Sequence, residues 1–543
     1  MEHNPLWYKN AIFYEVYVRA FHDSDGDGHG DLRGLAQKLD YLQDLGVDCL
    51  WLMPIYPSPL RDDGYDIADY YGILDTYGTL QDLKDLLEIA HARGIHIIAD
   101  LVLNHTSDEH DWFRSARSGR DAPYRNYYVW SDTDQKYKDA RIIFLDTEKS
   151  NWTWDPVSSQ YYWHRFYTSQ PDLNYDNPAV QQGMLDVVKF LLDLGVDGFR
   201  ADAVPYLFER DGTNCENLPE THVYLKRLRR YVHENYPGRI LLCEANQWPE
   251  DVRPYFGEGD EFHMGFHFPV MPRIYMALRK EDKLPLEWIL DRTPPIPSEC
   301  QWATFLRNHD ELTLEMVTEE ERRWMWQEYA PEPRMRLNLG IRRRLAPLLD
   351  NDRKKIEQAN SLLFTLPGSP IIYYGDEIGM GDDIRLPDRN GVRTPMQWEA
   401  GPGAGFSTAR DEAFYAPVIQ GSPYGPQWVN VAAQRNEPNS LWHTIRRMIT
   451  VRKAHPAFGW GDFGWAEAGS QAVAAYWRRT PQERLLILNN LSGSQQTASI
   501  TLPQEGGSKV RDILNGEELL VLSGESLEMA LRPYQYIWLS VEH

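Results

Sequence analysis

The sequence contains little cysteine and no long apolar run. Four of its 543 residues are cysteines, and none forms a CxxC pair. A disulfide framework is therefore not expected, and a reducing cytoplasm is the simpler location. No apolar run approaches the ~20 residues of a membrane-spanning helix, and the opening "MEHNPLWYKN" carries no apolar signal region. We therefore expect a cytoplasmic protein that does not enter a membrane.

Basic residues are outnumbered by acidic ones. The chain carries 56 Lys and Arg against 80 Asp and Glu, which gives a net charge of −24. This charge argues against nucleic acid or an anionic membrane as the partner, because both would be repelled. It leaves a neutral or cationic ligand, or simple solubility, as the reason for the acidity. Aromatic residues are abundant at 13%, and their flat faces suit sugars, although a large core uses them equally.

Short apolar runs alternate with helical patterns up to about residue 380. Most runs are apolar throughout at their start, as strands buried on both faces should be. Polar residues gather at the ends of most runs, which in a parallel barrel form the active-site face. The pattern predicts an α/β fold, a (β/α)8 TIM barrel. The eight runs span residues 11–21, 47–54, 95–105, 197–204, 240–246, 261–269, 303–310 and 369–376.

Two long segments interrupt this alternation. Near the C-terminus the pattern changes to short strands without helices between them. One segment is too long for a barrel loop and indicates an inserted domain after the third strand. The other follows the seventh strand and is charged and helical in pattern. Short strands split by Gly, Ser, Asn and Pro predict a C-terminal antiparallel β-sandwich domain. We expect the barrel at 1–105 and 175–467, the inserted domain at 106–174, the helical insertion at 311–355 and the β domain at 468–543.

Three acids, Asp202, Glu244 and Asp310, end three different strand runs. Converging charges drive carboxylate pKa values apart, and a paired acid and nucleophile can break a glycosidic bond. Arg200 lies two residues before Asp202, on the same face of the strand, and is predicted to keep that carboxylate ionised. One such acid would be more simply a structural ion pair, but three together favour a catalytic site.

Two histidines, His105 and His309, also end strand runs. Each could hydrogen-bond sugar hydroxyls around the three acids. A lone histidine at a strand end is more often a structural residue with satisfied hydrogen bonds. Two of them beside three carboxylates favour a place in the site.

Four short stretches resemble the signature regions of the α-amylase superfamily, glycoside hydrolase family 13, and stand in the family's order. The resemblance implies a retaining mechanism with Asp202 as nucleophile, Glu244 as general acid/base and Asp310 as the residue that stabilises the transition state. The stretches are "DLVLNH" (100–105), "GFRADAV" (198–204), "LLCEAN" (241–246) and "FLRNHD" (305–310).

The resemblance also implies a subsite for a terminal sugar. Arg393 in "RTPMQW" resembles the family arginine that pairs with the acid matching Asp62. That pair would close the floor of the pocket, so that the substrate is held by a terminal glucose. The residues implied at this subsite are Asp62, Tyr65, His105, Arg200 and His309.

The stretch "DSDGDGHGD" (23–31) places acids at alternate positions in a tight turn. Such a turn offers hard oxygen ligands for Ca²⁺, or it is simply an acidic solvated turn. The resemblance to members that act on oligosaccharides implies calcium, held by Asp23, Asp25, Asp27, Asp31 and the carbonyl of His29. It also implies a second calcium that ties the inserted domain to the barrel. The implied ligands there are Asn104, Asp172, Glu209 and the carbonyls of Tyr206 and Leu207.

Three stretches resemble those members of the family that isomerise maltose to trehalose: 5–31, "RNHDELTLE" (307–315) and 329–352. The resemblance implies intramolecular glucosyl transfer through a covalent glucosyl-enzyme, without an organic cofactor. Asn246 and Arg141 are hypothetical contacts of the retained glucose, and are equally well explained as surface polar residues. The partners implied are disaccharides, together with a possible homo-oligomer and a possible association with a maltose kinase.

Other reactions stay open at this stage. An oligo-α-glucosidase would carry the same three acids and hydrolyse maltose or short isomalto-oligosaccharides. A transglucosylase acting on sucrose is a weaker alternative. A non-catalytic barrel used for carbohydrate binding or as a transporter subunit is the alternative from another class, and the three intact acids argue against it.

Overall fold

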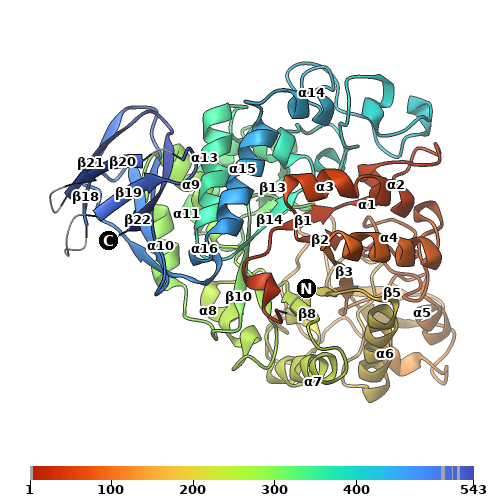
Figure 1. Ribbon diagram of the computed structural model, residues 1–543. Helices are drawn as coiled ribbons and strands as arrows, with labels where there is room; N and C mark the ends of the chain where they lie inside the picture. The colour runs from red at the N-terminus through yellow and green to blue at the C-terminus, as the bar shows by residue number, and fades with distance from the viewer. Residues whose placement is uncertain (1–3, 503–507, 517, 523–525, 543) are drawn as a thin grey trace.

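The protein is described by a computed structural model that covers residues 4–502, 508–516, 518–522 and 526–542. Eight parallel strands close a barrel in the order β1-β14-β10-β9-β8-β7-β3-β2 (Figure 1). Seven of the eight strands fall within the predicted apolar runs, and the eighth, β10, begins two residues before its run at 303–310, so the predicted TIM barrel is confirmed. The strands are β1 (Phe13–Val16), β2 (Cys49–Leu52), β3 (His96–Val102), β7 (Gly198–Asp202), β8 (Ile240–Cys243), β9 (Met264–Phe266), β10 (Gln301–Phe305) and β14 (Ser369–Tyr373).

Helices on the outside of the barrel begin and end at residues suited to those positions. In α4 (Leu80–Ala92), Thr79 and Asp82 form a capping box at the first turn. The helix α6 (Pro178–Leu194) starts after Asn177, which caps it, and ends at Gly195 in the left-handed conformation. Both helices bury one apolar face, as their sequence periodicity predicts.

The strand that carries Asp202 begins at a position where only glycine fits. Gly198 has φ +153°, and a Cβ there would lie 2.2 Å from the carbonyl oxygen of Ile240 on β8. A side chain would force β7 and β8 apart. The glycine therefore sets the close pairing that brings the C-terminal ends of these two strands together.

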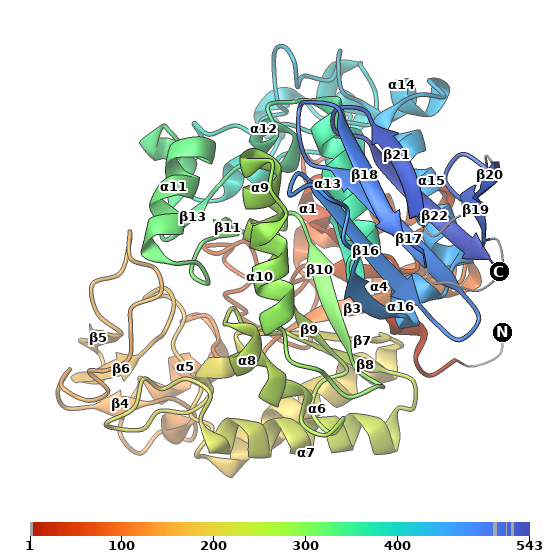
Figure 2. The ribbon, with the colours of Figure 1, turned by 90° about the vertical axis from the view of Figure 1, so that its left-hand side faces the viewer.

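Two insertions cover the C-terminal ends of the barrel strands. The inserted domain holds α5 (Asp111–Ala116) and a sheet of β4 (Trp130–Ser131), β6 (Gln160–Trp163) and β5 (Trp152–Asp155). The insertion after β10 contains the predicted helix, α11 (Glu319–Tyr329). It also contains a small sheet that the sequence did not predict, made of β11 (Leu312–Thr313), β13 (Gly340–Ile341) and β12 (Arg336–Leu337). Figure 2 shows both insertions on the same side of the molecule.

The C-terminal region forms a second, antiparallel β structure, which confirms the predicted β-sandwich domain. A six-stranded sheet runs from β15 (Asp462–Trp465) through β16 (Val473–Arg479), β17 (Arg484–Asn490), β22 (Tyr536–Glu542) and β19 (Ser508–Asp512) to β20 (Glu518–Leu522). It is joined by a pair, β18 (Gln496–Thr501) and β21 (Ser526–Leu531). The sheet begins at residue 462, before the expected boundary at 468, and residues 503–507, 517, 523–525 and 543 of the expected domain lie outside the described residues.

Candidate active site

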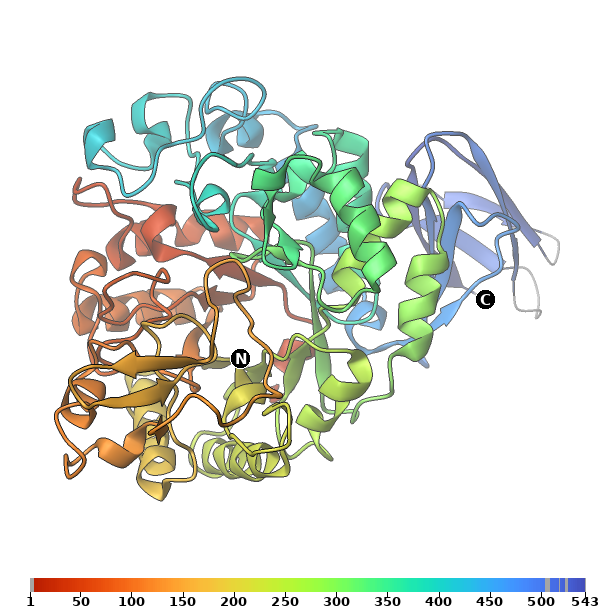
Figure 3. The same ribbon diagram turned by 180° about the vertical axis from the view of Figure 1, so that it is seen from behind.

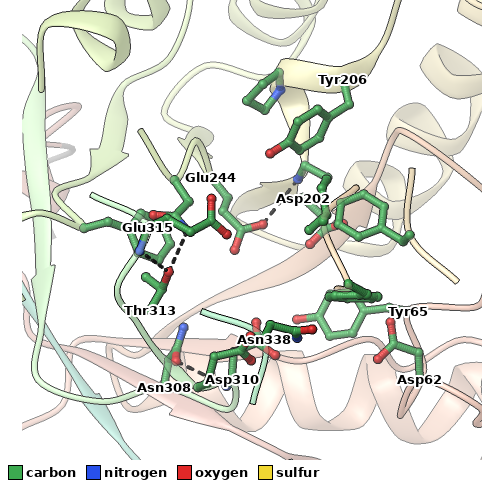
Figure 4. Close-up of a pocket in the computed structure, with 18 of the residues that line it drawn as sticks. Asp62, Tyr65, Asp202, Tyr206, Glu244, Asn308, Asp310, Thr313, Glu315 and Asn338 are labelled. Carbon is green, nitrogen blue, oxygen red and sulfur yellow. Dashed lines mark hydrogen bonds between the residues drawn. The ribbon is translucent and has the colours of Figure 1, made fainter. Parts of the chain in front are cut away.

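A pocket opens at the C-terminal ends of the barrel strands, beneath the two insertions. Figure 4 shows Asp202, Glu244 and Asp310 around this pocket. Aromatic side chains from the inserted domain and polar side chains from the 311–355 insertion complete its wall. Lining residues include Asp62, Tyr65, His105, Phe144, Phe166, Tyr206, Asn246, Glu311, Glu315, Asn338 and Arg389.

Arg200 lies beneath the pocket and is shared by three carboxylates. Its Nη1 is 2.7 Å from Asp202 Oδ1 and 2.6 Å from Asp100 Oδ1, and its Nη2 is 2.6 Å from Glu244 Oε1. Asp100 is fully buried and also accepts hydrogen bonds from Trp51 and Tyr65. Sequence reasoning missed Asp100, although it opens the stretch "DLVLNH".

This sharing corrects the prediction that Arg200 simply keeps Asp202 ionised. Burial raises the pKa of Asp202, and the nearby charges of Glu244 and Asp100 raise it further, while Arg200 lowers it. One guanidinium therefore faces three acids, and the charge of Asp202 depends on Asp100 and Glu244 as well as on Arg200.

The residue after Asp202 has an unusual backbone conformation. Ala203 has φ +51°, which is uncommon for a residue with a side chain. Its N–H donates to Glu244 Oε2 at 3.3 Å. The turn at the end of β7 therefore holds the Glu244 carboxylate as well as presenting Asp202, a role that the sequence did not reveal.

Asp310 is surrounded by cations. Arg389 Nη1 and Arg393 Nη2 lie 2.6 Å and 3.0 Å from its Oδ1, and His309 Nε2 lies 3.2 Å from its Oδ2. Burial raises the pKa of Asp310, but the charges of His309, Arg389 and Arg393 hold it well below its usual range. Asp310 is therefore ionised, as a group that stabilises positive charge must be.

The floor of the pocket is closed by a pair that differs from the predicted one. The partner of Asp62 is Arg389, whose Nη2 is 2.6 Å from Asp62 Oδ1. The predicted partner, Arg393, instead pairs with Asp63. Both arginines stand on the same loop, four residues apart, and the resemblance pointed to the wrong one of the two. Gln170 of the inserted domain donates to the other oxygen of Asp62 at 2.8 Å.

Two pocket residues carry buried polar atoms that no described group satisfies. These atoms are His105 Nε2 and Asn246 Oδ1. Burial lowers the pKa of His105 to about 3, so its ring is neutral. A buried polar atom without a partner costs free energy, which a ligand hydroxyl in the pocket would remove. Both residues were predicted from the sequence to face the substrate.

The comparisons with known proteins agree with this geometry. The sequence family described as "Alpha amylase, catalytic domain" matches residues 15–461, and "Maltogenic Amylase, C-terminal domain" matches residues 465–538. The chain belongs to the α-amylase family. The trehalose synthase/amylase of Mycobacterium tuberculosis is 59% identical over 92% of this chain and 84% of its own length.

Two further relatives of the family extend the likeness to the whole chain and to solved structures. The trehalose synthase of Pimelobacter sp. (strain R48) is 55% identical over 98% of this chain and 96% of its own length. The solved structure of a trehalulose synthase mutant in complex with Tris is 28% identical, with a TM-score of 0.79, covering 99% of this chain and 100% of its own.

Arg141 does not line the pocket, in contrast to the hypothesis that it contacts the retained glucose. Its guanidinium pairs with Glu216 at 2.9 Å and with Glu315 at 2.6 Å, and it donates to the Tyr206 hydroxyl at 3.2 Å. Tyr206 and Glu315 do line the pocket. Arg141 thus connects the inserted domain to the 311–355 insertion beside the pocket.

The acidic turn, residues 23–31, brings part of the predicted ligand set together. The carboxylates of Asp23, Asp25 and Asp27 have oxygens within 4.8 Å of one another. The carboxylate of Asp31 is outside this group and caps α2 (Leu32–Gln37) by accepting from Gly34 N–H. The His29 side chain accepts a hydrogen bond from Arg19.

A second group of oxygens lies where the inserted domain rejoins the barrel. Asn104 Oδ1, Asp172 Oδ2 and Glu209 Oε1 are buried and have no hydrogen-bond partner among the described residues. Burial raises the pKa of Asp172 to about 8 and that of Glu209 well above its usual range. We call these three side chains the buried oxygen cluster. Its donor set fits a hard cation such as Ca²⁺.

Proposed function

We propose that this protein isomerises maltose to trehalose by intramolecular glucosyl transfer. The observation that carries the proposal is the 55–59% identity to the curated trehalose synthases over more than nine-tenths of the chain. The pocket supplies what the reaction needs, since Asp202, Glu244 and Asp310 meet there above Arg200. The closed floor at Asp62 and Arg389 suits a substrate held by its terminal glucose.

The first transfer breaks the α-1,4 bond of maltose. Asp202 attacks the anomeric carbon of the non-reducing glucose while Glu244 gives its proton to the leaving oxygen. A covalent glucosyl-enzyme and a free glucose result. Asp310, held ionised by the cations around it, stabilises the positive charge that develops at the anomeric carbon.

The second transfer forms the α,α-1,1 bond. The freed glucose turns within the pocket, and its anomeric hydroxyl loses a proton to Glu244 and attacks the intermediate. The bond to Asp202 breaks and Glu244 is protonated again. Two inversions at the same carbon give net retention.

Water must stay out while the covalent intermediate exists, because hydrolysis would release two glucose molecules. Contacts between the two insertions close the pocket mouth. Arg141 pairs with Glu315, and the Asn338 N–H donates to Asp146 Oδ2 at 2.7 Å (Figure 3 shows the two insertions side by side). Phe144 and Phe166 line the pocket beneath these contacts. A cover of this kind excludes water, and its opening lets the disaccharide in and out.

Incubation with maltose, followed by separation of the products, tests the proposal. Mostly trehalose supports isomerisation, with minor glucose from hydrolysis. Mostly glucose would identify the hydrolase alternative, an oligo-α-glucosidase, and no turnover would identify a binding protein. Sucrose in a parallel incubation tests the transglucosylase alternative.

We propose that the buried oxygen cluster binds Ca²⁺. Asn104, Asp172 and Glu209 would hold the ion, with the carbonyls of Tyr206 and Leu207 as further ligands. When bound, the ion neutralises the two buried acids and fastens the inserted domain beside Asp202. The acidic turn is proposed as another calcium site, with Asp23, Asp25 and Asp27 as its carboxylate ligands and Asp31 and the His29 carbonyl as additional ones.

The cellular location of the protein and its partners are also proposals. All four cysteines are buried and free, which suits a reducing cytoplasm. No helix of the described residues is both long and apolar enough to span a membrane. A homo-oligomeric state and an association with a maltose kinase stay predictions, to be tested by light scattering and by co-purification.

A further inference from the structure

A buried glutamate lies behind the active site, and the mechanism above does not use it. Glu15 stands in β1 and is 0% exposed. Its neighbours in the barrel sheet are Trp51 on β2 and Tyr373 on β14. A carboxylate within the apolar strand "FYEV" needs a partner, since burying an unpaired charge is costly.

The partner of Glu15 is His309. The His309 Nδ1 lies 2.5 Å from Glu15 Oε1, and the backbone N–H of His309 donates to the same oxygen at 3.3 Å. On the other side of the ring, Nε2 lies 3.2 Å from Asp310 Oδ2. Tyr65 stacks on the ring at 5.3 Å between centroids, and Trp51 meets it edge-on at 5.8 Å. The ring is therefore fixed between two carboxylates.

Two carboxylates at the two ring nitrogens determine the protonation of the ring. A neutral imidazole donates from one nitrogen and presents a lone pair at the other. A neutral His309 would therefore set a lone pair against a carboxylate oxygen, whereas an imidazolium donates to both sides. Burial lowers the pKa of His309, but the charges of Asp310 and Glu15 raise it to about 9.

The other charged groups around the ring do not take the place of Glu15 and Asp310 at its two nitrogens. Arg393 donates from Nε to the His309 carbonyl at 2.8 Å. Arg389 and Arg393 both reach Asp310 through Oδ1, which leaves Oδ2 to the histidine. Asp100 lies near enough for His309 to lower its pKa, and Tyr373 lies near Glu15.

We propose that Glu15 is a positioning residue that keeps His309 as an imidazolium and, through it, holds Asp310 ionised and oriented. The role in glucosyl transfer rests on the proposed function. The protonation of His309 does not, because it is a property of the protein without substrate. Two barrel strands thus contribute acids to the site. Asp202 at the end of β7 is the proposed nucleophile, and Glu15 in β1 sets the charge of His309.

Nitrogen NMR of the histidine rings tests the protonation directly, without any activity measurement. The wild-type protein is labelled with ¹⁵N in its histidines, and His309→Asn identifies the signal. We expect both ring nitrogens of His309 to be protonated at neutral pH and to titrate well above the ordinary pKa of 6.5. A neutral ring at neutral pH would overturn the proposal.

The variant Glu15→Gln tests the consequence for the reaction, followed as maltose consumed so that isomerisation and hydrolysis both register. Removing the charge should move the alkaline limb of the pH profile of kcat/KM down by about 1 pH unit or more. A uniform loss at every pH, with no shift of the limb, would show a merely structural role and overturn the proposal. If maltose is not consumed by the wild type, the proposed function fails, while the NMR titration of wild type and variant still decides the role of Glu15.

Glu377→Gln is the matched control. Glu377 is also a fully buried carboxylate, held by the hydroxyls of Tyr14 at 2.8 Å and Tyr41 at 2.5 Å. It follows β14 and does not line the pocket. Its replacement should leave the shape of the pH profile unchanged. Glu15→Asp keeps the charge, and the His309 signal in that variant should stay that of an imidazolium.

Discussion

The catalytic acids and the buried oxygen cluster are neutralised in different ways. In the pocket, Asp202 shares Arg200 with two other acids, and Asp310 contacts two arginines and a histidine. In the cluster, Asp172 and Glu209 form no ion pair with the described residues, and each keeps a buried oxygen without a partner. The proposed reacting acids are thus paired with side-chain cations within the protein. The acids of the cluster have no such partner among the described residues, which is why we propose an external cation for them.

The largest expected effect comes from exchanging one acid of each kind for its amide. Asp202→Asn removes the nucleophile and should reduce turnover of maltose by at least about 10⁴-fold, as loss of a catalytic nucleophile does. The melting temperature should not fall, because a buried charge has been removed. Asp172→Asn is the matched variant. It should retain turnover per folded molecule and lose calcium-dependent stability, and equal losses of turnover in the two variants would contradict the comparison.

Removal of calcium should destabilise the protein through the cluster. A ligand present at about 100 times its Kd stabilises the folded state by about 2.7 kcal/mol, so chelation should lower the melting temperature. The shift is measured by scanning calorimetry with and without a chelator. Asp172→Asn should abolish most of the shift, and Asp25→Asn should remove the part that belongs to the acidic turn. A wild-type melting temperature indifferent to chelation would exclude both sites.

The variant Arg389→Lys tests whether the pocket depends on one arginine that pairs with both Asp62 and Asp310. The lysine cannot reach Asp62 and Asp310 together, so we expect kcat/KM to fall by about 10²–10³-fold, as when an oriented charge partner is lost. Arg385→Lys is the control on the same loop, because Arg385 is 74% exposed and pairs only with Asp383 in the described structure. Equal effects of the two changes would mean that Asp62 and Asp310 do not depend on Arg389.

The cation at the pocket mouth should control the product. Arg141→Ala breaks the connection to Glu216 and Glu315, and we expect the ratio of glucose to trehalose to rise several-fold as water enters. Asn246→Ala should act in the same direction by loosening the retained glucose. Arg120→Ala, which changes an exposed arginine of the inserted domain paired with Asp132, is the control. An unchanged ratio in the first two variants would remove both residues from the mechanism.

The smallest expected effect is a dependence of stability on pH through His309. Its pKa is raised from 6.5 to about 9 in the folded protein. The stabilisation is therefore complete below pH 6.5 and is lost as the pH rises through about 9. The melting temperature should fall over this interval, and it should fall less in Glu15→Gln. An identical pH dependence in wild type and variant would contradict the pairing.

Much of the fold could be predicted because local patterns determine it. Apolar runs with polar ends gave the barrel strands, and the order of the signature stretches placed Asp202, Glu244 and Asp310 on one face. The small sheet of β11, β12 and β13 escaped prediction, since its strands are two residues long and depend on neighbours rather than on their own sequence. The loop that carries Arg389 and Arg393 was equally hard to predict, because its conformation depends on its tertiary contacts and not on a local pattern.

By itself, the sequence determined which residues stand at the strand ends, because hydrophobic burial forces the register of each strand. The tertiary structure decided which charges meet. Asp62 and Arg389 are 327 positions apart, Arg141 and Glu315 are 174 apart, and Glu15 and His309 are 294 apart. No spacing rule connects such residues, and the resemblance pointed to Arg393, four positions from the arginine that pairs with Asp62. Only the closed barrel and its two insertions bring these side chains within the few ångströms at which charges set one another's protonation.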